Sequence, residues 1–243
     1  MPAVSANKQG MTDNQLNVPR IEEIIEWDVG NWSQALPFWT AHSKVAITTN
    51  ARALELGSRH GGLSLWLAFR GFNVVCSDVD QPTPRATALH DSYGFASRVT
   101  YARVDATAIT AHGQFDVVCF KSMLGAVGRG GIAAQRLAVE EMYRVLRPGG
   151  EVWFAENLRA SPFHRTLRWL FVPWARSWRY PTLSELRELF GRFSSLEIVT
   201  VGCFAAFGRT EKQRRFLSRL DNSRIMSVVP STWRYVAIGV ARK

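Results

Sequence analysis

Carboxylates stand at or near the ends of three short apolar runs in this 243-residue chain. Glu55 lies one residue before the end of the first run, and Asp78 and Asp105 close the next two. In open parallel sheets, ligands bind beyond the carboxyl ends of the strands. Three carboxylates at such ends are therefore candidates to hold the hydroxyl and amino groups of one nucleoside.

The loop after the first run contains glycines that suit a nucleotide-like ligand. Gly57 and Gly61 lack a Cβ, so the chain can turn sharply and a ligand can lie against bare backbone. The spacing Glu-x-Gly-x-x-x-Gly differs from that of dinucleotide sites, because Arg59 occupies the position of their second glycine. There is also no Lys-Ser/Thr pair of the kind found in a phosphate-binding P-loop. The structural alternative is a tight turn between a buried strand and a helix.

Asp78 follows Gly57 at about the distance, roughly 20 residues, that separates a nucleotide-binding turn from its ribose-binding acid. A carboxylate at this point can accept hydrogen bonds from both ribose hydroxyls of an adenosine. We therefore predict a ribose-binding role for Asp78, with Asp80 as a less favoured substitute. The structural alternative is a polar residue at a strand end.

Two stretches carry a family resemblance. With Glu55 two residues before Gly57, the first stretch resembles motif I of class I S-adenosylmethionine (SAM) methyltransferases. The second, Tyr143–Phe154, contains Leu-Arg-Pro-Gly-Gly and is similar to the family's turn before the fifth strand. The resemblance covers about Arg52 to Glu156 plus the C-terminal tail, and it implies SAM as the cofactor. The cofactor contacts that it implies are Glu55, Gly57, Ser58, Gly61, Asp78, Val79, Asp105, Ala106 and Lys121.

The pair Asp105-Ala106 resembles the adenine-contacting pair of that family. There, an Asp side chain accepts from the exocyclic amine and the next backbone N–H donates to the ring. An Asp after a strand is also a common helix N-cap, which is the structural alternative.

The resemblance and the order of apolar runs predict one α/β fold: a doubly wound, mostly parallel seven-stranded sheet with an antiparallel last strand and helical additions. We expect a disordered N-terminus over 1–18, because this stretch is polar and has no apolar core of a secretory signal. Residues 19–243 then form a single methyltransferase domain. Within it, 19–50 is expected to be an N-terminal lid or an edge helix, and 157–182 a cap insertion.

Four side chains are candidates for the acid–base chemistry of methyl transfer to an alcohol. They are Lys121, Glu156, His164 and Asp28. Glu156 and Asn157 are expected to point into the mouth of the crevice. Lys121 either binds an anionic group of the substrate, lowers the pKa of its hydroxyl, or is a partly exposed loop lysine.

The Asn/Asp-Pro-Pro-aromatic motif of some N-methyltransferases is absent, because Lys-Ser-Met-Leu stands there. No metal-ligand spacing is evident, so we predict metal-independent transfer.

Composition limits the location and the partners. Cys76, Cys119 and Cys203 are scattered in apolar runs, which indicates buried free thiols in a reducing, cytoplasmic compartment. No run of about twenty apolar residues suggests a spanning helix. The net charge of +10 is uneven: residues 1–156 carry 14 Lys/Arg and 15 Asp/Glu, and residues 157–243 carry 16 and 5. A basic C-terminal third favours an anionic partner.

The cap segment combines aromatic residues with arginines. An apolar helical face is predicted from the recurrence of Phe163, Leu167, Leu170, Phe171, Trp174 and Trp178. Pro173 should break or kink the helix. The segment suits a cap whose apolar face covers the active site, or an interfacial helix on an anionic membrane. The basic stretch 209–224 is either a solvated helix face or an anion-binding patch.

We predict a SAM-dependent methyltransferase that acts on a hydroxyl of a small or glycan acceptor, anionic or lipid-linked. The lid, cap and basic tail resemble methyltransferases of bacterial surface-polysaccharide pathways. The alternatives are a natural-product or lipid O-methyltransferase, a nucleic-acid methyltransferase, a nicotinamide dehydrogenase, and a non-catalytic basic binding protein. Nucleic acid is disfavoured because no recognition motif is present. Contact with the inner face of the membrane is expected only through the cap, and the sequence does not predict the oligomeric state.

Overall fold

The computed structural model describes residues 18–111, 114–172 and 176–243. The expected disorder of 1–18 therefore lies outside the described residues, except for Val18. The centre of the fold is a seven-stranded sheet of order β3-β2-β1-β4-β5-β7-β6. Pairing is parallel from β3 to β5 and antiparallel for β5–β7 and β7–β6. The predicted fold class is confirmed. The strands are β1 Arg52–Leu56, β2 Asn73–Asp78, β3 Val99–Arg103, β4 Phe115–Lys121, β5 Leu146–Asn157, β6 Ser195–Val201 and β7 Val236–Arg242.

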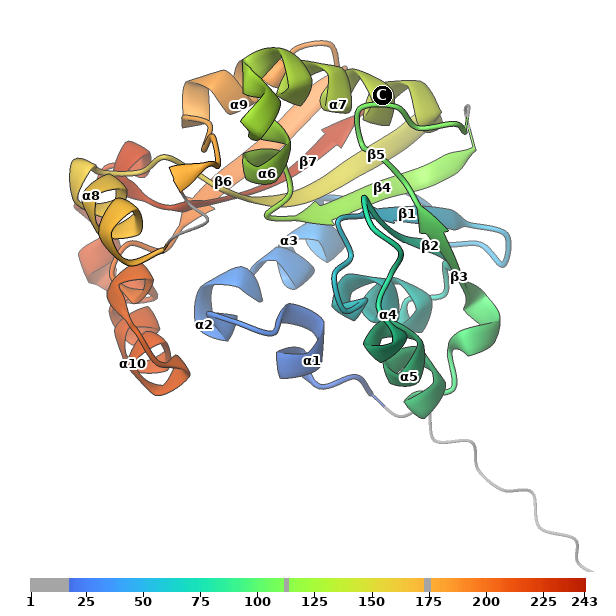
Figure 1. Ribbon diagram of the computed structural model, residues 1–243, viewed down its shortest axis with the longest axis horizontal. Coiled ribbons are helices and arrows are strands. Elements are labelled where there is room, and N and C mark those ends of the chain that lie inside the picture. Colours follow the sequence, from blue (N-terminus) through green and yellow to red (C-terminus); the bar gives the residue numbers. More distant parts are fainter. Residues whose placement is uncertain (1–17, 112–113, 173–175) are drawn as a thin grey trace, which may run out of the picture.

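Helices cover both faces of this sheet, as Figure 1 shows. Helices α1 to α5 lie on one face, and α6, α7 and α9 lie on the other. The remaining two, α8 and α10, lie at the end of the sheet near β6 and β7. The helices are α1 Ile21–Ile25, α2 Val29–Trp32, α3 Ala35–His42, α4 Gly62–Phe69, α5 Pro84–Ser92, α6 Leu124–Val127, α7 Gly131–Val145, α8 Pro162–Phe171, α9 Leu183–Leu189 and α10 Glu211–Asp221.

Two hydrophobic cores lie against the two faces of the sheet, because successive strand side chains point to opposite sides. Trp153 of β5 packs with Trp39 and Trp66 in the first core. Phe154, the next residue, stacks on Phe190 in the second core. Both faces of the central strands are therefore apolar, which is typical of a parallel sheet covered by helices. Helix ends follow from local chemistry, as in α9, where Thr182 and Glu185 form a capping box.

The last two strands pair antiparallel as expected, and α10 and short 3₁₀ turns lie between them. Two other expected elements are shorter than the sequence indicated. The expected third strand ends at Arg103 rather than Asp105. The cap helix α8 ends at Phe171, and Pro173 and Trp174 lie outside the described residues. Among the helices of the described ranges, none is long and apolar enough to cross a membrane.

Candidate active site

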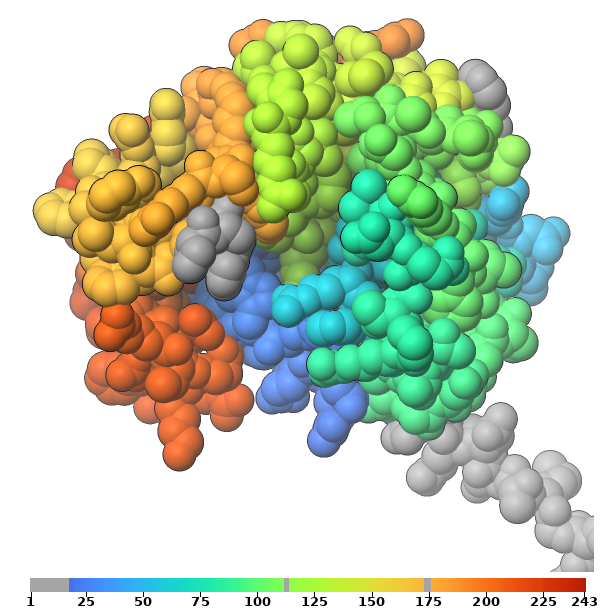
Figure 2. All heavy atoms as spheres, in the orientation of Figure 1, coloured from blue at the N-terminus to red at the C-terminus, as the bar shows by residue number. Residues whose placement is uncertain are grey.

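A cavity of about 1480 Å³ opens beyond the carboxyl ends of β1, β2 and β4. Figure 2 shows this face hollowed where the N-terminal helices, the loop after β1 and the start of α6 meet. Single-ligand pockets usually have volumes of about 300–1,000 Å³, so this cavity has room for a cofactor and an acceptor together. Its position agrees with the rule that open α/β sheets bind ligands at the strand ends.

The glycine loop forms one wall of the cavity. Gly57 and Gly61 have φ values of 72° and 78°, and Arg59 between them has 49°. These left-handed conformations explain the glycines at two of the three positions. Ser58 is buried, and its Oγ has no hydrogen-bond partner among the described residues. A buried hydroxyl without a partner in a cavity wall fits contact with a polar ligand, which is the expectation for a bound SAM.

Glu55 lies beneath this loop and shapes it. Its carboxylate accepts a hydrogen bond from the Ser64 backbone N–H at 2.8 Å and another from the Ser64 hydroxyl. Ser64 stands in the first turn of α4, so Glu55 satisfies a backbone donor of that helix that has no partner within the helix. Burial raises the pKa of Glu55 to about 8. Glu55 lines the cavity but is engaged with its own helix, so its geometry is that of a loop-supporting residue.

Asp78 ends β2 and lines the cavity together with Val79. One carboxylate oxygen accepts from the Arg59 backbone N–H at 2.9 Å, and the other accepts from the Val79 N–H at 2.8 Å. Each oxygen has a second lone pair in addition to these bonds. The carboxylate is therefore oriented by the backbone and can still accept hydrogen bonds from a ribose.

Asp105 and Ala106 also line the cavity, after β3. The Asp105 carboxylate accepts from the Thr107 backbone N–H at 2.8 Å and from the Thr107 hydroxyl at 2.7 Å. These two bonds lower the pKa of Asp105. The structure thus places the predicted adenine pair at the same cavity as Asp78, with Asp105 held in a local turn.

Lys121, at the end of β4, connects the sheet to the N-terminal segment. Its ammonium group donates to the Ile25 carbonyl at the end of α1. Burial lowers the pKa of Lys121 to about 8. Gly62 lets α1 pack closely, because a Cβ at this position would collide with the backbone carbonyls of Glu23 and Ile24 in α1. These contacts seat α1 on the glycine loop.

The N-terminal segment contributes cavity walls and core residues in turn. Trp27 and Asp28 line the cavity, whereas the neighbouring Trp32 is fully buried in the core. Glu26 ties the segment to the glycine loop through His60, at 2.5 Å. The predicted role of 19–50 as a moving lid stays a prediction.

Asp28 belongs to a buried network on the cavity wall. The Tyr235 hydroxyl donates to its carboxylate, and Asn31 Nδ2 donates to Tyr235 at 2.9 Å. The same Asn31 amide donates to Asp221 at 2.8 Å. Burial, and then the negative charges of Asp221 and Glu211, raise the pKa of Asp28 to about 7, against the lowering effect of the Tyr235 bond. A carboxyl group that titrates near neutral pH beside a cavity has the properties of a general base.

The other two predicted bases are less favourably placed. Both ring nitrogens of His164 have partners: Nε2 donates to the Cys203 carbonyl at 2.8 Å, and Nδ1 lies 2.7 Å from the Ser161 hydroxyl. Burial lowers the pKa of His164, which keeps the imidazole neutral. Glu156 does not line the cavity, and its carboxylate accepts from the backbone N–H of Leu124 at 2.7 Å. The expectation that both Glu156 and Asn157 enter the crevice is correct only for Asn157, because Glu156 caps α6 instead.

The side of the cavity formed by α8 and the segment before α9 presents hydrogen-bond donors. Arg168 donates to the Leu158 carbonyl at 2.7 Å and lies 4.3 Å from the Tyr180 ring centre. No carboxylate of the described residues forms an ion pair with Arg168, and burial lowers the pKa of its guanidinium. The indole N–H of Trp178 is also buried without a partner in the described part of the chain. Of the expected inward apolar face of α8, Leu167 and Phe171 line the cavity, whereas Phe163 and Leu170 are exposed. His164 and Arg168 line the cavity as well.

Sequence reasoning missed Tyr235, Arg168 and Gly62 as site residues. Tyr235 is 207 positions from its partner Asp28, and no local pattern joins them. Arg168 lies on another face of the predicted helix than its apolar residues, and the helical period alone does not show which side of α8 meets the cavity. Gly62 was visible as part of the glycine loop, but its close contact with α1 depends on the tertiary structure.

One protein-family model matches the central part of the chain. Residues 54–154 match the model of the methyltransferase domain. No curated protein matches the sequence. Together with the fold, the domain match supports a class I SAM-dependent methyltransferase, and SAM as cofactor is consistent with it. No group of three His, Cys, Asp or Glu side chains that could hold a metal ion is found in the described ranges.

Solved structures of low identity share the fold. Phosphoethanolamine N-methyltransferase 2 of Haemonchus contortus is 18% identical with a TM-score of 0.58, and the match covers 87% of this chain and 52% of that one. The chain thus spans about half of the length of that enzyme. The 1,6-didemethyltoxoflavin N1-methyltransferase of Burkholderia thailandensis is 18% identical, with a TM-score of 0.56 and coverage of 86% and 76%. Geranyl diphosphate C-methyltransferase of Streptomyces coelicolor is 14% identical, with a TM-score of 0.63 and coverage of 87% and 79%.

Proposed function

We propose that this SAM-dependent methyltransferase transfers a methyl group to a hydroxyl of a small or glycan acceptor that carries an anionic group. The observation that carries the proposal is the Asp28 carboxylate on the cavity wall, held by Tyr235 and with a pKa of about 7. A hydroxyl is a weak nucleophile and gains from a positioned general base. A neutral amine is a stronger nucleophile, so it depends less on such a base.

The cofactor would be held by the residues of the glycine loop and the strand ends. Asp78 would accept from the ribose hydroxyls, Asp105 and Ala106 would contact the adenine, and Gly57 would leave the backbone open to the amino-acid part. When bound, SAM supplies a methyl carbon made electrophilic by its sulfonium. The protein then has to hold the acceptor in line and to exclude water.

Asp28 would act on the acceptor. In its ionised form it takes the proton from the acceptor hydroxyl as the oxygen–methyl bond forms. The methyl–sulfur bond breaks with its electron pair staying on sulfur, so the products are the methyl ether, neutral S-adenosylhomocysteine and one proton. Tyr235 and Asn31 keep the carboxylate in place.

The anionic group of the acceptor would lie at Arg168. This guanidinium forms no ion pair with a carboxylate of the described residues, although Glu156 attracts it electrostatically, and the indole N–H of Trp178 is a donor without a partner in the same wall. A half-buried cation that forms no ion pair gains from an anionic ligand. Two structural neighbours fit this class: the H. contortus enzyme was solved with phosphomonomethylethanolamine and the S. coelicolor enzyme with geranyl diphosphate, both of which contain phosphate.

A cytoplasmic location is part of the proposal, because all three cysteines are free and buried. The surface-glycan resemblance has no support from the compared proteins, which include N- and C-methyltransferases. The proposal therefore keeps glycans as one acceptor class and natural products or lipids with a hydroxyl as the alternative.

A product-release assay across acceptor classes tests the proposal. Formation of S-adenosylhomocysteine would be measured with phosphorylated sugars, phosphorylated lipid alcohols, neutral sugars and phosphorylated amines, and the methylated atom would be located by NMR. We expect turnover with phosphate-bearing alcohols and a new O–CH₃ signal. Turnover confined to amines or to carbon nucleophiles would refute hydroxyl methylation and leave the methyltransferase class intact.

A further inference from the structure

Helix α8 exposes large apolar side chains on the side away from the cavity. Phe163, Trp169 and Leu170 are 68%, 59% and 49% exposed. The opposite side of the same helix lines the cavity through His164 and Arg168. Soluble proteins rarely expose apolar side chains in contiguous groups without an interaction to explain them.

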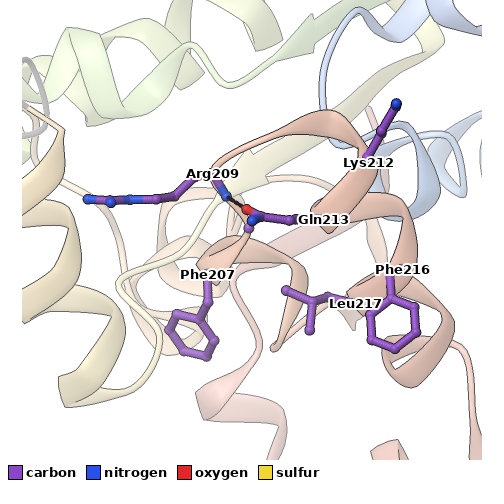
Figure 3. A pocket seen from close by; sticks show the side chains of 7 residues that line it. Phe207, Arg209, Lys212, Gln213, Phe216 and Leu217 are labelled. Atoms are coloured by element: carbon purple, nitrogen blue, oxygen red, sulfur yellow. Dashed lines mark hydrogen bonds between the residues drawn. The ribbon is translucent and has the colours of Figure 1, made fainter.

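The rim of the cavity connects these side chains to α10. Phe171, the last residue of α8, is 57% exposed and lines the cavity, and its ring centre lies 4.5 Å from the Arg209 guanidinium. Arg209 also lines a shallow groove of about 520 Å³ together with Phe207 and Phe216. Figure 3 shows both phenylalanine rings on one side of this groove, with Lys212 and Arg209 extending outward from it. Phe216 is 63% exposed, so the groove lies open to solvent.

The two segments that form this face are strongly basic. Residues 158–180 contain five arginines and no acidic residue, and residues 205–224 contain six basic and two acidic residues. One of the acids, Asp221, is buried and accepts from the backbone N–H groups of Cys203 and Phe204 at 2.8 Å. Its charge is thus directed into the protein, and the outer face is cationic.

We propose that this face, named here the α8–α10 surface, docks onto an anionic phospholipid bilayer. Exposed Trp, Phe and Leu side chains enter the headgroup–acyl boundary, and neighbouring Lys and Arg meet anionic headgroups. Basic residues near an anionic membrane are attracted by its negative surface potential. The α8–α10 surface consists of Phe163, Arg165, Trp169, Leu170, Phe171, Phe207, Arg209, Lys212 and Phe216.

Charge and side-chain chemistry favour a bilayer over the other occupants. A symmetric contact between two copies would bring two cationic faces together, and like charges repel. A single-stranded nucleic acid would use the aromatic rings as stacking platforms, but the exposed Leu170 offers no such ring. A bilayer accommodates leucine, phenylalanine and tryptophan alike.

Docking would place the cavity mouth at the membrane. Phe171, Phe207 and Arg209 line the large cavity as well as belonging to the α8–α10 surface. An acceptor with a lipid chain could then enter from the bilayer while its anionic group reaches Arg168. This consequence rests on the proposed function, whereas docking itself requires neither SAM nor an acceptor.

Vesicle flotation of the full chain, without SAM or acceptor, tests the docking. We expect the protein to float with vesicles of phosphatidylcholine mixed with phosphatidylglycerol and not with vesicles of phosphatidylcholine alone. Two double variants, Trp169→Ser with Phe216→Ser and Arg165→Glu with Lys212→Glu, should each reduce partitioning about tenfold or more. All four residues are exposed, so their melting temperatures should match that of the unchanged protein.

Matched control variants are available on α7 and α9, away from α10 in Figure 1. Leu137 of α7 is 45% exposed, and Arg187 of α9 is exposed, so Leu137→Ser and Arg187→Glu should leave flotation unchanged. No flotation with anionic vesicles, or equal losses in control and test variants, would overturn the proposal. Binding to an oligonucleotide, or a dimer in solution, without flotation would also overturn it and would identify the other occupant. Methyl transfer measured on a water-soluble acceptor distinguishes these outcomes from failure of the proposed function.

Discussion

The Tyr235 hydroxyl donates a hydrogen bond to the Asp28 carboxylate across 207 positions of the sequence, on the wall of the large cavity. Because burial raises the pKa of Asp28 to about 7, the group is half ionised near neutral pH. If Asp28 is the base, kcat/KM should rise with pH through about 7 and then level off. Asp28→Asn should lower kcat by about 10²–10⁴-fold and remove this limb of the pH profile. Stopped assays from pH 5.5 to about 8.5 measure both effects.

His164→Gln serves as the comparison for this prediction. Both nitrogens of His164 are engaged with Ser161 and Cys203, so the variant should keep the rise near pH 7 even if its overall rate falls. A pH limb that survives in Asp28→Asn and vanishes in His164→Gln would transfer the role of base to the histidine.

Arg168 should control affinity for the anionic group of the acceptor. Arg168→Gln removes a charge-assisted donor of about 1.5–3 kcal/mol, so KM for a phosphate-bearing acceptor should rise roughly tenfold to a hundredfold. Arg165→Gln, one turn earlier and exposed, should leave KM unchanged. Steady-state kinetics at fixed ionic strength separates these cases, and an equal effect of both substitutions would point to general charge rather than to a site.

The sequence predicted the residues at the strand-end half of the cavity better than those at the half near α8, for a physical reason. Gly57, Asp78 and Asp105 each follow their own strand, and parallel strands bring their carboxyl ends to one edge without further information. Asp28, Tyr235 and Arg168 meet only through the packing of segments far apart in the chain. Helical periodicity indicated that α8 is amphipathic, but it did not show that Leu167 lines the cavity together with the polar His164 and Arg168.

Glu55 should make stability depend on pH. Its pKa in the folded state is about 8, well above the unfolded value of about 4. A raised carboxyl pKa gives stability that is complete below the unfolded value and is lost as pH rises through the folded one. The free energy of unfolding of the unchanged protein, relative to that of Glu55→Gln, should therefore fall between pH 5 and 8, by at most about 1.4 kcal/mol per pH unit. Denaturant titrations check this, and a constant difference would show that Glu55 keeps an ordinary pKa.

Gly62→Ala should loosen the N-terminal segment. Alanine is the better helix former by about 1 kcal/mol, so a substitution at the first residue of α4 would ordinarily stabilise the protein. Here the new Cβ would collide with the carbonyls of Glu23 and Ile24, so the sign should reverse. Hydrogen exchange should become faster over residues 20–28 while the strands stay protected. Unchanged exchange in that segment would mean that α1 is not held against Gly62.

Isothermal titration with S-adenosylhomocysteine tests the central claim, that the carboxylates at the strand ends hold the adenosine of SAM. The unchanged protein should bind one equivalent. Asp78→Asn should weaken binding by about tenfold or more, because it replaces a charged acceptor of the ribose hydroxyls. Asp80→Asn, two residues further on and outside the cavity wall, should bind as the unchanged protein does. Absence of binding by the unchanged protein, or equal affinities in the two variants, would contradict the account.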